Sequence, residues 1–219
     1  MKTDFHIHTL YSRDGSMSLE TVIETARRRH IDCLAISDHN TTYGAEKMLE
    51  YLTTNVPLKI IVGEEIKTTH GEIIGLFIRE EIPPDLSPEE TVAQIKAQGG
   101  LVYIPHPFDR LRRSRLEENK LLELLPQIDI IEVYNARITV QADNLRAEEL
   151  ARNSNLLRAA GSDAHCTYEL GRAYVEMPPF ETKEEFLLSL ARGKVVGRLS
   201  SPLVHFVSTW SKLRKKHLG

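Results

Sequence analysis

Short apolar runs alternate with helix-forming segments along the whole chain, and this alternation constrains the fold most strongly. The apolar runs cover residues 33–36, 58–62, 72–78, 101–104, 128–134 and 156–160. Their length and predominantly apolar character are typical of buried strands, and the run 33–36 is apolar without interruption, as in a strand covered on both faces. Helical patterns separate most of these runs, and Ser18 and Ser87 stand where capping residues are expected. The chain therefore predicts a parallel α/β architecture.

Polar residues with metal-binding side chains occur where the apolar runs end. In chain order they are His6, His8, His39, Glu65, His106, Asp163 and His165. His6 and His8 are two residues apart, so on a regular strand they share one face and Phe5 and Ile7 share the other. Asp163 and His165 repeat that spacing.

Parallel strands direct their carboxyl ends to one rim, so these side chains are expected to meet there. Nitrogen and oxygen donors without thiolates suit Zn²⁺, Mn²⁺ or Fe²⁺. Together with Asp14 the donors are too many for one tetrahedral ion, which predicts two or three divalent ions, with Glu65 as a bridge. The positive charge of several such ions would attract an anionic substrate, and phosphate fits best.

Five short motifs extend the argument to a family. They are His6-x-His8, Ser37-Asp38-His39, Gly63-x-Glu65, His106-Pro107 and Gly161-Ser162-Asp163-Ala164-His165. In this order they resemble the PHP (polymerase and histidinol phosphatase) superfamily. The resemblance implies an α/β fold, a distorted (β/α)7 TIM-like barrel with a metal cluster at its C-terminal rim, and hydrolysis of phosphoesters. The length and the short loop carrying Asp14 resemble the small stand-alone phosphoesterase branch.

The resemblance also implies a ligand set for each metal ion. The first ion would be held by His6, His8, Glu65 and Asp163, the second by Asp14, His39 and His165, and a third by Glu65 with His106. Many members have a histidine at the position that Glu72 occupies here. Glu72 is therefore a further candidate ligand, and this departure leaves the third site open.

A metal pair predicts the mechanism of hydrolysis but does not specify the substrate. A hydroxide bridging two ions would attack phosphorus in line, and no protein nucleophile is needed. We expect a phosphoesterase acting on a nucleotide, a small phosphorylated metabolite or an oligonucleotide end. One alternative is an amidohydrolase-type metal hydrolase, although no rim lysine is predicted. Another is a non-catalytic metal-binding or regulatory PHP domain, although nearly all the expected ligands are present.

Arginines near the predicted rim are candidates for substrate binding. The segment 109–115 follows His106-Pro107 and contains four arginines, of which Arg110 lies nearest to the predicted metals in sequence. Arg137 and Asn135 follow another predicted strand. Guanidinium groups grip phosphate oxygens in pairs, so Arg110 and Arg137 are expected to bind substrate. Asn135 is expected either to orient the substrate or only to close the strand.

Composition and length bound the remaining expectations. The chain of 219 residues has no evident linker, so residues 1–219 are expected to form one domain, with an amphipathic C-terminal helix at about 203–218 packed on the barrel. A net charge of −3 provides no global field for nucleic acid. No leader, membrane span or disulfide framework is evident, which predicts a cytoplasmic protein that binds no membrane and needs no obligate protein partner.

Overall fold

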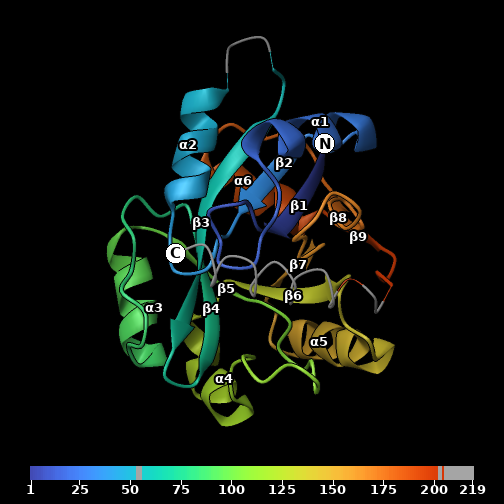
Figure 1. The fold of residues 1–219 in the computed structure, drawn as a ribbon. Coiled ribbons are helices and arrows are strands. Elements are labelled where there is room, and N and C mark those ends of the chain that lie inside the picture. The colour runs from blue at the N-terminus through green and yellow to red at the C-terminus, as the bar shows by residue number, and fades with distance from the viewer. Residues whose placement is uncertain (53–55, 202–203, 205–219) are drawn as a thin grey trace.

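The computed structural model describes residues 1–52, 56–201 and 204 (Figure 1). The helix expected at 203–218 lies, apart from Val204, outside these residues. The described elements are β1 (Lys2–Ile7), α1 (Leu19–Arg29), β2 (Cys33–Ile36), α2 (Tyr43–Tyr51), β3 (Lys59–Thr68), β4 (Gly71–Leu76), α3 (Pro88–Ala97), β5 (Leu101–Ile104), α4 (Glu118–Leu124), η1 (Leu125–Gln127), β6 (Ile130–Asn135), α5 (Gln141–Asn153), β7 (Leu157–Gly161), β8 (Ala173–Glu176), α6 (Lys183–Ala191) and β9 (Lys194–Gly197).

The strands of the described chain form one nine-stranded sheet in the order β7-β6-β5-β4-β3-β2-β1-β8-β9. The sheet curls until β1 comes beside β7, where His8 N donates to Ala164 O at 2.8 Å and Asp163 N donates to His6 O at 2.7 Å. Strands β1 to β7 thus form the nearly closed, TIM-like barrel that the resemblance implied. The barrel places the first and last metal-binding motifs side by side.

The parallel arrangement expected from the sequence holds for most of the barrel but is interrupted at β4. Strands β3 and β4 pair antiparallel, because only Thr69 and His70 separate them and so short a connection can join only antiparallel strands. Strand β4 also pairs antiparallel with β5, and β8 pairs antiparallel with both β1 and β9. The remaining pairs are parallel, so the carboxyl ends of β1, β2, β3, β5, β6 and β7 share one rim.

Alternate residues of each strand pack on opposite sides of the sheet. Outside the barrel, Leu34 and Ile36 of β2 pack with residues of α1 and α2. Inside it, Cys33 and Ala35 of the same strand join a cluster that also contains Phe186 of α6. Helix α6 lies in the middle of the ring of strands in Figure 1. The barrel therefore has an apolar interior as well as an apolar coat.

Strand β1 departs from this alternation through a bulge. Asp4 is paired with Leu34 and Ile7 with Ile36, so two residues of β1 lie opposite one residue of β2. Phe5 consequently packs inside the barrel, whereas Ile7 packs outside it. The expectation that Phe5 and Ile7 share a face is wrong, because the extra residue shifts the pleat by one position.

Helix capping follows the sequence signals. Ser18 Oγ accepts a hydrogen bond from Thr21 N, and Ser87 forms a capping box with Glu90 at the start of α3. Pro88 occupies the first turn, where its missing N–H is not needed. Among the described residues no helix has both the length and the apolar character required to cross a membrane.

Candidate metal centre

Inward-facing side chains change from apolar to polar along five strands as these approach the rim. The pairs are Phe5 and His6 on β1, Ile61 and Glu65 on β3, Tyr103 and His106 at β5, Ile130 and Glu132 on β6, and Ala159 and Asp163 at β7. The polar members are fully or almost fully buried. On each of these strands, the apolar side chain packed in the barrel interior fixes the backbone that carries the polar rim side chain.

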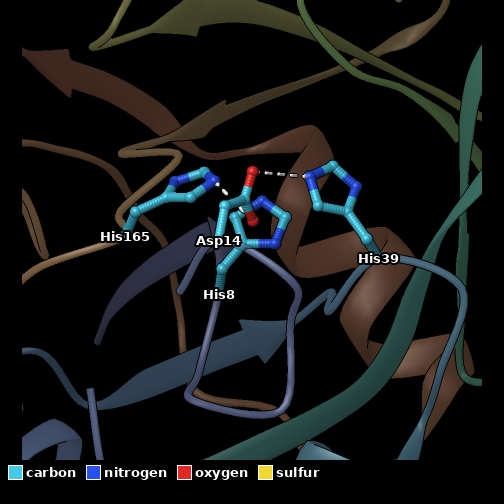
Figure 2. A group of neighbouring side chains, drawn as sticks. All are labelled: His8, Asp14, His39 and His165. Atoms are coloured by element: carbon cyan, nitrogen blue, oxygen red, sulfur yellow. Dashed lines mark ion pairs between the residues drawn. The ribbon is translucent and has the colours of Figure 1, made fainter. Parts of the chain in front are cut away.

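Four of the polar side chains surround a common point (Figure 2). The carboxylate of Asp14 lies between two imidazoles, with Oδ2 3.4 Å from His39 Nε2 and Oδ1 3.2 Å from His165 Nε2. The His8 ring lies beside both, with ring centroids 4.6 Å from His39 and 4.2 Å from His165. One donor atom from each residue lies within 4.8 Å of the others, a spacing suited to one ion.

Glu65 Oε2 lies at the centre of a neighbouring group. It is 3.6 Å from His6 Nε2, 3.4 Å from His8 Nε2 and 3.0 Å from His39 Nδ1. Its other oxygen, Oε1, lies 3.0 Å from His106 Nε2. Glu65 therefore faces four imidazoles from three strand ends, those of β1, β2 and β5, the arrangement expected of a carboxylate that bridges two ions.

The remaining candidates complete overlapping groups. Asp163 Oδ1 lies 3.8 Å from His6 Nε2 and 3.5 Å from His8 Nε2, and Glu72 Oε1 lies 3.8 Å from His39 Nδ1. The structure thus brings together every candidate ligand from the sequence, in four groups of three or four donors: His6, His8, Asp14, His39, Glu65, Glu72, His106, Asp163 and His165.

Unused acceptor atoms test whether a cation fits. Glu65 Oε2, Glu72 Oε2 and Asp163 Oδ1 are buried and accept no hydrogen bond from any described residue. A buried carboxylate oxygen without a donor is costly, so such atoms are rare unless an ion or water satisfies them. These three lie in the groups described above, and their N and O chemistry suits Mn²⁺, Zn²⁺ or Fe²⁺. The residues present therefore fit divalent ions.

The central carboxyl groups remain ionised despite their burial. Burial raises the pKa of Glu65, but the charges of His39 and His6 and a hydrogen bond from His106 bring it well below its ordinary value. Burial also raises the pKa of Asp163, but Arg112 and His6 bring it well below its ordinary value. Both groups consequently present negative charge to a cation at neutral pH.

The two histidines of β1 differ in charge although they are two residues apart. Burial lowers the pKa of His6, but the carboxylates of Asp163 and Glu65 raise it well above its ordinary value. Burial and the neighbouring His165 lower the pKa of His8 well below its ordinary value. His8 is thus already in the neutral form that ligates metals, whereas an ion binding to His6 must displace a proton.

Glu132 supports this cluster from beneath, and the sequence analysis did not identify it. Its Oε1 accepts hydrogen bonds from His6 Nδ1 at 3.2 Å and Tyr103 Oη at 2.8 Å. Its Oε2 accepts from His106 N at 2.6 Å and Asn135 Nδ2 at 2.9 Å. By holding the proton on Nδ1 of His6, Glu132 leaves Nε2 to face the cluster. A lone acid within the apolar run 130–133 was the available signal.

The loop after β1 is fixed to β2 by short hydrogen bonds. Thr9 donates from its N and Oγ1 to the two oxygens of Asp38, both at 2.6 Å. Ser12 Oγ donates to Asp14 Oδ1 at 3.1 Å and accepts from His39 N at 3.3 Å. These contacts position the loop residue Asp14 against His39.

Two of the candidate ligands have left-handed backbone conformations. His106 has φ = +33° and Asp163 has φ = +53°. Such angles are uncommon for residues with side chains and cost about 1–3 kcal/mol each. The surrounding bonds hold them: Glu132 accepts from His106 N, and Asp163 N donates to His6 O. Strain of this kind concentrates at functional sites.

Asn135 and Arg137, two of the predicted substrate-binding residues, lie beside the cluster and are buried. Asn135 Nδ2 donates to Glu132 Oε2 and, at 3.3 Å, to Asp163 Oδ2. Arg137 Nη1 lies 2.6 Å from His165 Nδ1, and its Nε lies 3.1 Å from Glu169 Oε1. Asn135 is fully buried, so its contacts are those of a residue that orients Asp163; its role in substrate binding stays a prediction.

Arg110 does not reach the cluster. Its guanidinium is bonded to Asp143, with Nε 3.0 Å from Oδ1, and the side chain is 60% exposed. Arg112 instead enters the site, where Nη2 donates to Asp163 Oδ2 with the side chain only 17% exposed. Asp143 holds Arg110 away from the cluster, so a role of Arg110 in binding substrate stays a prediction. No sequence signal separates Arg112 from its neighbours.

Relatives of known sequence match the chain over most of its length in one case and over little more than a third in another. A protein of Methanocaldococcus jannaschii recorded as uncharacterized is 36% identical over 197 residues, which are 85% of this chain and 78% of that one. A phosphoribosyl 1,2-cyclic phosphate 1,2-diphosphodiesterase of Eggerthella lenta is 33% identical over 89 residues, 38% of this chain and 33% of that one.

Solved structures share the fold. A two-domain protein of Bacteroides vulgatus containing a predicted PHP-like metal-dependent phosphoesterase aligns with a TM-score of 0.73 and 18% identity, over 90% of this chain and 65% of that one, so this chain spans less than two-thirds of it. An amidohydrolase of Chromobacterium violaceum with bound sulfate aligns with a TM-score of 0.64 and 18% identity, over 89% of this chain and 98% of that one.

The family model of the PHP domain matches residues 4–215, which include every motif discussed above. The barrel and the gathering of histidines and carboxylates at its rim agree with that match. The chain belongs to the PHP domain family, whose members are generally metal-dependent phosphoesterases.

Proposed function

We propose that this protein is a metal-dependent phosphoesterase that hydrolyses a phosphate ester at the rim cluster. One observation carries the proposal. Buried carboxylate oxygens without hydrogen-bond donors, on Glu65 and Asp163, lie among neutral and cationic imidazoles beside the guanidinium of Arg112. The carboxylates and imidazoles can ligate metal ions, and the neighbouring guanidinium can donate hydrogen bonds to an anion. This combination suits an anionic substrate held by metal ions.

The described side chains would divide into two sets around the ions. His8, Asp14, His39 and His165 would hold one ion, and His6, Glu65 and Asp163 with His8 a second, with Glu72 and His106 near a third position. Bound divalent ions would neutralise the phosphoryl oxygens and acidify a water molecule for attack on phosphorus.

The chain's own residues would orient the substrate. Arg112 can exchange its bond to Asp163 for a phosphoryl oxygen once a cation balances that carboxylate. Arg137, 3.8 Å from Asp163 Oδ1, supports the same region from the other side. Because both arginines are almost buried, their attraction for an anion is screened by little water.

The amidohydrolase alternative has a structural neighbour but less support at the site. In the described residues no lysine pairs with Glu65, Glu72 or Asp163, and the cations that contact the acidic groups are arginines and histidines. A planar guanidinium matches two phosphate oxygens, which favours phosphoester over amide substrates. The full set of donors also disfavours a non-catalytic domain.

The test is turnover by protein reconstituted with Mn²⁺, using p-nitrophenyl phosphate, its bis ester, a nucleotide panel and a carboxamide panel. Wild type should release product from a phosphate ester. The variants His8→Ala and Asp163→Asn should lose about a thousandfold in kcat/KM, since a divalent ion contributes several kcal/mol. Asp85→Asn, at an exposed site, is the charge-matched control.

Three results would contradict the proposal. Equal turnover by wild type and both variants would place the chemistry elsewhere. Hydrolysis of carboxamides alone would establish the amidohydrolase alternative. Retention of fewer than two ions per chain after reconstitution, measured by mass spectrometry of metals, would exclude a metal pair.

A further inference from the structure

A cleft of 510 Å³ lies beside the metal cluster on the loop between β5 and α4. Charged and amide side chains line it: Arg110, Arg112, Arg113, Arg115, Glu117, Glu118 and Asn119. Since this lining includes no aromatic or aliphatic side chain, it suits a charged group better than a nucleobase or an acyl chain.

Arg112 connects the cleft with the cluster. Its guanidinium donates to Asp163 Oδ2 in the cluster, and the same side chain lines the cleft. A substrate held at the cluster therefore lies one arginine side chain away from the cleft.

The cleft carries positive charge that the protein does not neutralise. Arg110 is paired with Asp143, Arg112 with Asp163 and Glu118 with Arg146. By contrast, Arg113 and Arg115 form no ion pair or side-chain hydrogen bond with any residue of the described ranges. Against these two guanidinium groups the lining offers one uncommitted acid, Glu117.

The backbone that presents these arginines is fixed to the hairpin of β3 and β4. Glu72 N donates to Ser114 O at 2.8 Å, and Glu117 N donates to His70 O at 2.9 Å. The turn packs so closely that a Cβ on Gly71 would lie 2.4 Å from Arg115 O. A loop held in this way pays little ordering entropy when a ligand binds.

We propose that this cleft binds a second phosphate group of the substrate, so that the preferred substrates carry a further phosphate beside the one that is hydrolysed. The inference rests on the proposed phosphoesterase function and names its substrate class. Two unpaired guanidinium groups match the oxygens of a phosphate in bidentate geometry. The second phosphate can come from the next linkage of an oligonucleotide or from a small bisphosphorylated molecule.

The first experiment removes only the charge of the second phosphate. The substrates are 5′-phosphorylated dithymidylate and its analogue with a neutral methylphosphonate linkage, assayed with Mn²⁺-reconstituted protein. Wild type should prefer the charged substrate by about tenfold or more in kcat/KM, as expected for charge-assisted bonds to phosphate. Arg113→Ala/Arg115→Ala should bring this ratio close to one, and Arg113→Lys/Arg115→Lys should restore part of it.

Arg79→Ala/Arg192→Ala is the matched control, because it removes the same charge from exposed positions at the opposite end of the barrel. This control should keep the wild-type ratio. Fructose 1,6-bisphosphate against fructose 6-phosphate forms the small-molecule arm. If kcat/KM rises with the second phosphate only in the dinucleotide, the cleft binds nucleic-acid ends. If it rises only in the sugar, the cleft binds small bisphosphates.

A binding assay separates failure of this inference from failure of the proposed function. Metal-free protein is titrated with fluorescent 5′-phosphorylated tetrathymidylate at several salt concentrations. The slope of log affinity against log salt should fall by roughly 0.7 for each arginine removed. Arginine-dependent binding without turnover of any phosphate ester would uphold the cleft and refute the function. Turnover with no preference for a second charge, or a preference that survives Arg113→Ala/Arg115→Ala, would overturn the cleft.

Discussion

The barrel interior has two halves with opposite chemistry. Toward the amino ends of the strands it is filled by aromatic and aliphatic side chains, with Phe186 of α6 within 5.8 Å of Phe5 and 5.1 Å of Phe180 between ring centroids. Toward the carboxyl ends it is filled by histidines and carboxylates that are equally buried. The same strands therefore pass from a region that stabilises the fold to one that costs free energy.

The difference teaches that the rim depends on the apolar half. Buried charges contribute little net stability even when paired, so the free energy that keeps them in place must come from elsewhere. Five strands connect the two halves directly, as from Tyr103 to His106 and from Ile130 to Glu132. Variants in the two halves should accordingly separate stability from activity.

The largest separation is expected at Glu65. Glu65→Gln removes the central carboxylate and should lower kcat/KM about a thousandfold, since at least one ion is weakened. Metal content should fall, whereas the thermal transition of the metal-free protein should keep a single cooperative step. Phosphate release and bound metal per chain are the measurements. If the kcat/KM of Glu65→Gln stayed within tenfold of the wild-type value, the assignment of activity to the rim half would be contradicted.

Phe186→Ala tests the apolar half. Truncation of a fully buried aromatic residue should lower the free energy of unfolding by about 3–5 kcal/mol. The kcat of the folded fraction should change much less, because Phe186 belongs to the apolar cluster, where its ring packs against those of Phe5, Phe77 and Phe180. Urea unfolding gives the first quantity, and Leu188→Ala, 65% exposed on the same helix, is the control. A loss of kcat without a loss of stability would contradict the division.

Glu132→Gln probes the boundary between the halves. Glutamine replaces one acceptor oxygen by an NH₂ group that would face donors such as His106 N and Asn135 Nδ2. Metal affinity should fall by about 10- to 100-fold, and activity should return at high metal concentration. Metal titration and the ¹⁵N chemical shifts of His6 report the change, with Glu148→Gln as the control. Unchanged shifts would show that Glu132 does not set the His6 tautomer.

Glu72→Gln should have the smallest effect and the opposite sign. Burial and the nearby carboxylate of Glu65 raise the pKa of Glu72, so the ionised side chain is disfavoured in the metal-free protein. Removing its charge should stabilise that form by about 1 kcal/mol at pH 8 while weakening metal binding. Melting curves with and without chelator measure both effects, against Glu24→Gln on the exposed face of α1. If Glu72→Gln melted at a lower temperature than wild type in the presence of chelator, repulsion between the carboxylates of Glu65 and Glu72 would be refuted.

Much of the fold was predictable from the sequence because its signals are local. Apolar runs located the strands, Ser18 and Ser87 marked helix starts, and the residues at strand ends identified the rim on which the candidate ligands meet. The pairing of β3 with β4 was missed because β3 continues past its apolar run through the polar residues up to Thr68, which leaves only a two-residue turn before β4. The choice between Arg110 and Arg112 was not predictable, because it depends on a contact distant in sequence, that of Asp143 with Arg110.

The bulge in β1 makes the spacing between Phe5 and His6 intolerant of insertion or deletion. Its extra residue lets Phe5 and His6 both enter the barrel, one into each half of the interior. Deleting one residue there would return the strand to strict alternation and turn either the aromatic ring or the imidazoles outward. In β1, therefore, the count of residues matters as much as their identity.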